Sequence, residues 1–239
     1  MSSESTRSRE VTVLAVLLAV AVVIIGMLLM RPSATTPAPS SGAPSAAAST
    51  RGTVKDTARR LPGDPMALGR VDAPVVMVEY ADYACPFCAT FALETQPALV
   101  KKYVDAGVLR IEWHDLVIFG EKSQRAAQAA RAAGAQGKFW EFHHALFAAS
   151  PGSGHPDLTD DRLVGFATAA GVRDLPAFHK AMTSSAVEEA VGRETQVARQ
   201  LGATSTPVFV INGTPVVGAQ PAEVFTQVID RAAAAATQG

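Results

Sequence analysis

The only two cysteines of the chain, Cys85 and Cys88, are separated by two residues. An apolar, β-branched run at 75–80 precedes them and predicts a buried strand, and the residues after them have the apolar spacing of a helix. At such a junction, the free N–H groups and the dipole of the helix start stabilise a thiolate. This favours a redox dithiol in which Cys85 is the exposed, low-pKa nucleophile and Cys88 resolves the mixed disulfide.

Three other interpretations of the cysteine pair are weaker. A zinc site needs about four ligands, and none of the five histidines has ligand spacing to the pair. A purely structural disulfide over so short a loop removes only about 2 kcal/mol of chain entropy from the unfolded state. Two inert thiols at this spacing would be a coincidence. We therefore expect neither a metal ion nor a cofactor.

The elements around the pair predict an α/β layer. A helix follows the cysteines, with Pro97 as an expected kink or break, and a second strand covers 109–113. A long helical block follows, and Pro207 then opens a third strand. Asn212-Gly213 is a two-residue hairpin signal, and Pro221 begins a last helix. The chain has no internal repeat.

An uninterrupted apolar segment lies near the N-terminus. Residues 11–30 contain 18 apolar residues out of 20 and no charge, which at 1.5 Å per residue spans a bilayer core. We expect an uncleaved membrane anchor; a cleaved signal peptide is the alternative, although its apolar core is usually shorter. Arg7 and Arg9 precede the segment and only Arg31 follows closely, which favours a cytoplasmic N-terminus at 1–10.

Composition separates the anchor from a folded domain. Residues 31–60 are rich in Pro, Ala and Ser and predict a semi-extended linker, so the globular domain is expected at 61–239, with a helical insertion at about 121–201. The formal net charge is −1, so the chain lacks the excess of positive charge expected of a nucleic-acid-binding protein. We expect the domain on the extracytoplasmic side of the cell membrane.

Three stretches carry a resemblance to a known family. They are EYADYACPFC at 79–88, GKFWEFH at 137–143 and LGATSTPVFVING at 201–213. In this order they resemble the DsbA-like thiol–disulfide oxidoreductases, over about 65–233 of this chain. The resemblance implies an α/β, thioredoxin-like fold with an inserted helical subdomain, here preceded by one N-terminal transmembrane helix.

The resemblance also implies roles for residues outside the cysteine pair. Pro207 would follow a cis peptide bond and lie against the pair, leaving the Thr206 backbone free to pair with an extended substrate. An ordinary proline opening an edge strand is the alternative. Glu79 would be the acidic residue beneath the site and take part in proton transfer; otherwise it is a carboxylate facing solvent. Pro86 and Phe87 would tune the potential of the pair.

Two details qualify the resemblance. Ser205 stands where family members often have glycine, which leaves the shape of the substrate loop open. An anchor and a linker occupy the place of the dimerisation domain found in the isomerase branch, which argues against an isomerase. The aromatic residues Phe139, Trp140, Phe142 and Phe147 are read as packing of the insertion.

The expected function is donation of disulfides to secreted or cell-envelope proteins through Cys85 and Cys88. A DsbB-like or VKOR-like membrane protein would reoxidise the pair. One alternative keeps the fold and reverses the electron flow, giving a reductase for disulfide correction or for cytochrome c thiols. Another is a non-catalytic extracytoplasmic binder or chaperone that uses the groove near Pro207.

Overall fold

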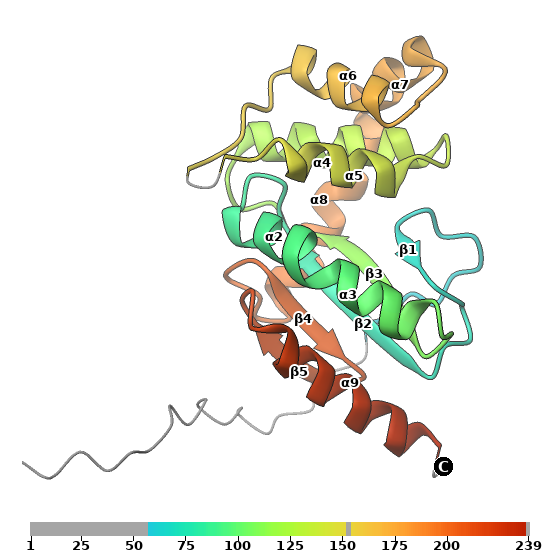
Figure 1. Cartoon of the computed structure of the whole chain (residues 1–239). Helices are drawn as coiled ribbons and strands as arrows, with labels where there is room; N and C mark the ends of the chain where they lie inside the picture. The colour runs from blue at the N-terminus through green and yellow to red at the C-terminus, as the bar shows by residue number, and fades with distance from the viewer. Residues whose placement is uncertain (1–56, 152–153, 238–239) are drawn as a thin grey trace, which may run out of the picture. The chain divides into compact units, whose positions relative to one another are not determined.

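The computed structural model describes residues 57–151 and 154–237 (Figure 1). The predicted anchor at 11–30, the N-terminal segment before it and nearly all of the predicted linker lie outside these residues. Among the helices that the structure describes, none is both long enough and apolar enough to cross a membrane.

A mixed sheet of five strands in the order β1-β3-β2-β4-β5 lies at the centre of the described part. β2 and β3 run parallel, and the other neighbouring pairs are antiparallel. The strands are β1 Ala67–Leu68, β2 Val75–Ala81, β3 Leu109–Asp115, β4 Val208–Ile211 and β5 Thr214–Val217.

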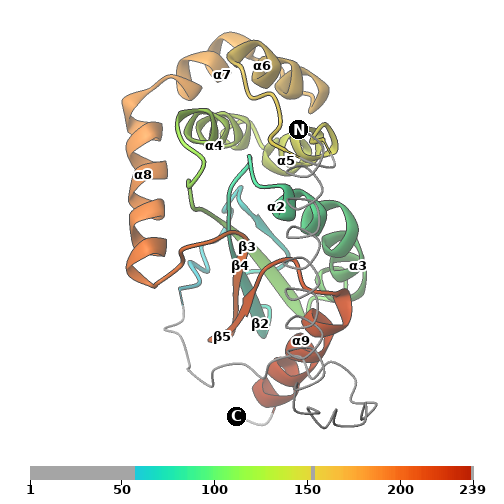
Figure 2. The same ribbon diagram turned by 90° about the vertical axis from the view of Figure 1, so that its left-hand side faces the viewer.

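Every residue of β2 and β3 is buried, because helices cover both faces of the sheet. Successive strand residues point to opposite faces. On one face, Val75 and Met77 pack against α3 (Gln96–Leu99) and the C-terminal helix α9 (Ala222–Ala236). On the other, Val76 and Val78 pack against α8 (Ser185–Gln200). Figure 2 shows α8 on one side of the sheet and α3 and α9 on the other. This continuous burial confirms the predicted α/β layer.

A single helical run connects the parallel strands and begins directly after the first cysteine. It consists of α2 Pro86–Thr90, the π-helical turn η1 Phe91–Thr95, α3 Gln96–Leu99 and a second π-helical turn, η2 Val100–Val104. Of the expected kink or break at Pro97, the break is wrong, because the helical run continues through this residue. Gln96 N–H donates to the carbonyl of Phe91, five residues back, and this wider turn accommodates a proline that lacks its own donor.

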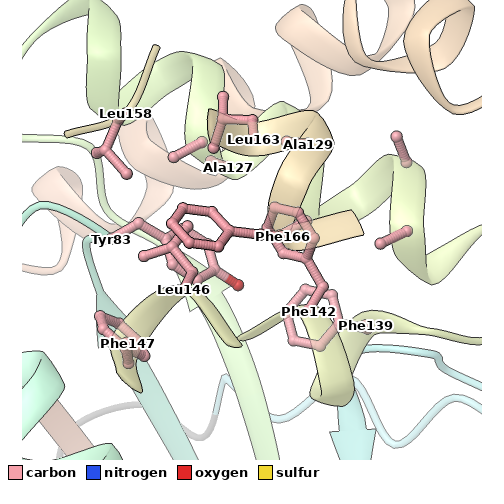
Figure 3. Close-up of a cluster of buried hydrophobic side chains, with 14 of the residues drawn as sticks. Tyr83, Ala127, Ala129, Phe139, Phe142, Leu146, Phe147, Leu158, Leu163 and Phe166 are labelled. Atoms are coloured by element: carbon pink, nitrogen blue, oxygen red, sulfur yellow. The ribbon is translucent and has the colours of Figure 1, made fainter. Parts of the chain in front are cut away.

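The predicted helical insertion is present between β3 and β4. It consists of α4 Glu121–Gly134, α5 Phe139–Ala148, α6 Asp160–Ala169, α7 Leu175–Met182 and α8 Ser185–Gln200. Phe139, Phe142 and Phe147 are at most 2% exposed and pack in one cluster with Tyr83 and Phe166 (Figure 3). The reading of these aromatic residues as packing is therefore confirmed, with Trp140 partly buried against the same cluster.

The predicted hairpin joins β4 to β5. Asn212 and Gly213 have φ values of 41° and 84°, the two positive angles that a type I′ turn requires. Pro221 is the residue before α9, where its fixed φ suits a helix start.

The folded part begins before Leu61, where composition placed the end of the linker. Arg59 donates side-chain hydrogen bonds to Asp64, Glu194 and the Trp113 carbonyl, at 2.6–2.9 Å. The backbone N–H groups of Arg59 and Arg60 donate to the buried carboxylate of Glu112. Composition could not reveal this attachment, because all of its partners except Asp64 lie on β3 and α8.

Candidate active site

Cys85 is the residue on which α2 begins. Its backbone is extended, with φ −81° and ψ 119°, and Pro86 follows in the first turn, as expected. Its N–H donates to the carbonyl of Asp82, and its Sγ lies 3.3 Å from the carbonyl oxygen of Thr206. The Thr206–Pro207 peptide bond is cis. The structure thus brings Thr206 and Pro207 to the cysteine pair, as the resemblance implied.

Cys85 is more enclosed than a nucleophile at a helix start was expected to be. It is 2% exposed and Cys88 is fully buried, so the expectation of an exposed Cys85 is wrong. The reason is that Sγ points toward the Thr206 carbonyl, 121 positions along the chain, instead of into solvent. Within the motif the exposed side chain is Phe87, at 64%.

The two thiols differ strongly in acidity. The pKa of Cys85 is lowered to about 6, first by a hydrogen bond from the Cys88 side chain and then by the Thr206 side chain and the N–H groups of Cys88 and Phe87, against the opposing effect of burial. Burial raises the pKa of Cys88 well above its ordinary value. At neutral pH the pair therefore holds one thiolate, on Cys85, and one thiol, on Cys88.

Glu79 is fully buried in β2, beside Trp113 of β3 and Phe209 of β4. Neither of its carboxylate oxygens has a hydrogen-bond partner among the described residues. Burial raises its pKa to about 8, and its negative charge in turn raises the pKa of Cys88. The alternative of a carboxylate facing solvent is therefore wrong: Glu79 is a buried group that holds a proton at neutral pH.

Asp82 is a site residue that the sequence reasoning missed. It is 2% exposed and accepts hydrogen bonds from the N–H groups of Ala84, Ile118 and Phe119 and from the Ser123 hydroxyl. These bonds tie the segment before Cys85 to the segment that leads into α4. The bond from Ala84, two residues on, is an Asx turn, which an aspartate at the end of a predicted strand could have signalled.

His155 was also missed, and no local signal could have found it. Its Nδ1 lies 2.8 Å from the carbonyl oxygen of Ala84, and its ring lies against Phe119 at a centroid distance of 4.8 Å. Since a carbonyl can only accept, Nδ1 carries the hydrogen. His155 comes from the α5–α6 connection, so this contact attaches the insertion to the residue just before Cys85.

Metal binding is not supported by the side chains around the pair. Over residues 57–151 and 154–237, no three His, Cys, Asp or Glu side chains gather as ligands. The arrangement is instead suited to thiol–disulfide exchange: a stabilised thiolate, a buried resolving thiol and a buried, protonated carboxyl that acts on it electrostatically.

Comparison with known proteins agrees with this chemistry. A family model described as thioredoxin matches residues 62–231. A "Probable disulfide bond formation protein D" of Bacillus cereus is 28% identical over 150 residues, which cover 62% of this chain and 69% of that protein. A thioredoxin-like oxidoreductase structure from Silicibacter pomeroyi is 30% identical, with TM-score 0.61, and the match covers 73% of this chain and 93% of that one.

Two further similarities concern the fold and the extent of the match. The structure of oxidised BdbD from Bacillus subtilis has TM-score 0.66 at 23% identity, over 72% of this chain and 93% of that one. An Na(+)/H(+) antiporter NhaA 3 of Salinispora tropica is 32% identical over 148 residues, which are 61% of this chain. The match spans only 21% of that antiporter, so it concerns one part of a longer protein.

Proposed function

The chain belongs to the thioredoxin family and is a DsbA-like disulfide oxidoreductase with the motif Cys85-Pro86-Phe87-Cys88, and from this we propose that it donates disulfides to secreted or cell-envelope proteins. The observation that carries the proposal is the unequal acidity of the pair. A thiolate stabilised on Cys85 favours the reduced form, and a stabilised reduced form makes the disulfide a strong oxidant.

The proposed reaction consists of two exchange steps. A substrate thiolate attacks Sγ of Cys85, which forms a mixed disulfide and releases Cys88 as a thiolate that takes up a proton. A second substrate thiolate then attacks the substrate sulfur of the mixed disulfide and releases Cys85 as a thiolate. The substrate loses two electrons and the cysteine pair gains them. The low pKa of Cys85 makes it the better leaving group in the second step.

Glu79 is proposed to supply the proton in the first step. Its carboxyl is buried, is protonated at neutral pH and acts electrostatically on Cys88. When Cys88 is released as a buried thiolate, the uncharged Glu79 carboxyl is a buried acidic group whose charge state acts on it. Transfer of the proton to Cys88 moves the negative charge to Glu79, whose carboxylate is the weaker base of the two buried groups.

The surface beside Cys85 suits an unfolded or extended substrate. Phe87 is 64% exposed within the active-site motif, and Phe119, 40% exposed, packs against His155, whose ring is bonded to the Ala84 carbonyl. Thr206 and Pro207 border the same thiol, and we propose that the Thr206 backbone pairs with an extended substrate strand there. Apolar contacts of this kind fit client chains that have not yet buried their hydrophobic residues.

We place the catalytic domain outside the cytoplasm, attached to the membrane through 11–30, with a DsbB-like or VKOR-like membrane protein as its oxidant. Disulfides persist in oxidising compartments, and tethering raises the local concentration of a membrane partner. A reporter fused after Gly239 that is active only outside the cytoplasm would support this topology. A reporter that is active in the cytoplasm would contradict it.

The reduction potential of Cys85 and Cys88, measured by equilibration with glutathione buffers, tests the direction of electron flow. A value near about −120 mV, as in DsbA, is the expected result, and a value near about −270 mV, as in thioredoxin, would instead favour a reductase. The two values differ by roughly 7 kcal/mol for a two-electron couple, so the outcomes are well separated.

A further inference from the structure

The peptide unit between Ala84 and Cys85 is held at both of its polar ends. Its N–H group, on Cys85, donates to the carbonyl of Asp82 at 3.1 Å. Its carbonyl oxygen, on Ala84, accepts a hydrogen bond from His155 Nδ1 at 2.8 Å. A peptide unit is a rigid plane, so two bonds at its opposite ends fix its orientation. The bond from His155 therefore helps to orient the peptide that leads into the nucleophile.

The orientation of this peptide affects where the sulfur of Cys85 points. Cys85 is the last extended residue before α2. Its Sγ lies 3.3 Å from the Thr206 carbonyl oxygen, and the N–H groups of Phe87 and Cys88 stabilise its negative charge. These contacts depend on the direction of the Cα–Cβ bond of Cys85, which changes when the preceding peptide turns. A rotation of that peptide would therefore move Sγ relative to the groups that stabilise the thiolate.

The donor of the carbonyl bond comes from an anchored part of the inserted subdomain. His155 lies in the α5–α6 connection, 71 positions from Ala84. Leu158, three residues further on, is 2% exposed and belongs to the buried cluster that also contains Tyr83 and Ala84. Figure 3 shows Leu158 and Tyr83 within this cluster. Burial of Leu158 limits how far the imidazole can move from the carbonyl.

A second contact holds the ring of His155 in place. The ring packs against Phe119, with a centroid distance of 4.8 Å and an angle of 50° between the planes. The Phe119 N–H donates to Asp82 Oδ2 at 3.2 Å, and the carbonyl of the same aspartate accepts from the Cys85 N–H. His155, Phe119 and Asp82 thus form a connected set of contacts that reaches both ends of the peptide before the nucleophile.

We propose that His155 is a positioning residue for thiol–disulfide exchange, whose hydrogen bond to the Ala84 carbonyl orients the peptide before Cys85 so that Sγ stays among the groups that stabilise its thiolate. In this role the imidazole acts through the backbone of Ala84 and not on the reacting sulfur. The proposal rests on the thiol–disulfide chemistry of the pair, and it holds for either direction of electron flow.

Two substitutions separate the hydrogen bond from the ring and from its charge. His155→Phe keeps an aromatic ring beside Phe119 and removes the donor. His155→Asn loses the ring but carries an amide N–H at the same distance along the side chain as Nδ1, and it cannot take up a proton. The matched control is His179→Phe, which changes an exposed histidine on α7.

The pH profile of Cys85 alkylation, measured with iodoacetamide on the reduced full chain in lipid nanodiscs, is the first readout. His155→Phe is expected to move the midpoint up by about 0.5 pH unit and to lower the rate at pH 6 roughly twofold, because the thiolate loses part of its stabilisation. His155→Asn and His179→Phe should keep the profile of the unaltered chain. Unchanged profiles in all variants would overturn the proposal. Equal shifts in His155→Phe and His155→Asn would also overturn it, since the hydrogen bond would then not be the cause.

The equilibrium with glutathione at pH 7 is the second readout. A less stable thiolate makes the disulfide a weaker oxidant, so His155→Phe should shift the equilibrium constant about threefold toward the disulfide form, which corresponds to about 14 mV. Urea unfolding checks that each variant is folded, and His155→Leu replaces His155→Phe if the latter is not. A loss of stability with an unchanged glutathione equilibrium would show a purely structural contact and contradict the proposed role.

The two proposals on the redox site fail separately. The difference in reduction potential between the variants tests His155. The absolute potential of the unaltered chain tests the direction of electron flow.

Discussion

The sulfur of Cys85 lies 3.3 Å from the carbonyl oxygen of Thr206, the residue that precedes cis Pro207. This contact joins the start of α2 to the start of β4 and encloses the nucleophile. The same threonine contributes through its side chain to the lowered pKa of Cys85. The loop at 204–207 therefore both lowers the pKa of the Cys85 thiol and shields that thiol from solvent.

The two cysteines should have separable roles in turnover. Cys85→Ser is expected to abolish disulfide transfer to a reduced protein substrate, because it removes the sulfur that is attacked. Cys88→Ser should accumulate mixed disulfides between Cys85 and substrate, visible by non-reducing electrophoresis and mass spectrometry. Mixed disulfides that form only in the Cys85→Ser chain would reverse the assignment. Full biological activity of the double serine variant would support the non-catalytic binder instead.

The reactivity of reduced Cys85 should follow its lowered pKa. The alkylation rate with iodoacetamide is expected to rise through pH about 6 and to level off above it, because the thiolate is the reactive form. Thr206→Val removes the hydroxyl group that helps to lower the pKa, so its profile should move to higher pH. Thr195→Val, at a buried threonine on α8, is the control and should leave the profile in place. A midpoint close to that of a free cysteine would contradict the structure.

The same shift affects the stability of the reduced protein. The folded-state pKa of Cys85 is below its unfolded value, so the stabilisation is fully present above the unfolded pKa and is lost as pH falls through about 6. The disulfide form has no thiolate and lacks this contribution. Urea unfolding should therefore find that the stability advantage of the reduced form over the oxidised form shrinks between pH 8 and pH 5. A constant difference over this range would refute the prediction.

Glu79 should lower stability at high pH. Its folded-state pKa of about 8 is above the unfolded value, so the unfolded state gives up a proton first and stability falls as pH rises between 4.5 and 8. Glu79→Gln removes this cost and should be more stable than the unaltered chain above pH 8, by an amount on the order of a few kcal/mol. Below about pH 4.5 the free energies of unfolding of Glu79→Gln and of the unaltered chain should be similar.

The control for Glu79 is an exposed carboxylate in the same domain. Glu121→Gln, at the start of α4, changes a side chain that is open to solvent and should leave the pH dependence of urea unfolding nearly unchanged. If Glu79→Gln followed the same pH curve as the unaltered chain, Glu79 would not be the buried, proton-holding group described above.

Asp82 should be needed for the stability of the active-site segment. Asp82→Ala leaves the N–H groups of Ala84, Ile118 and Phe119 without their acceptor, and we expect a loss of about 3 kcal/mol in urea unfolding. The matched change Asp157→Ala removes one exposed bond, to the Thr159 N–H, and should cost well under 1 kcal/mol. Equal losses for the two variants would show that the Asp82 bonds contribute nothing beyond a surface turn.

Local patterns were enough to predict the order of elements and the reactive pair. The β-branched run before Cys85, the helical spacing after it and the Asn212-Gly213 turn each act through neighbouring residues, so each can be read from a short stretch. Pro97 is the exception among these signals. A proline removes a donor wherever it stands, but whether a helix ends there depends on an alternative hydrogen bond, which here is the bond from Gln96 to Phe91.

By itself, the sequence determined the type of chemistry, the α/β class and the helical insertion, since these follow from residue types and local periodicity. Only the tertiary structure decided that Cys85 is covered, that Glu79 is buried with no partner in the described part of the chain, and that Arg59 belongs to the folded part. Each of these depends on groups far apart in the chain, as the contact between Cys85 and Thr206 across 121 positions illustrates. Burial and the pKa shifts it causes are properties of packed neighbours, and no local pattern specifies which neighbours the fold brings together.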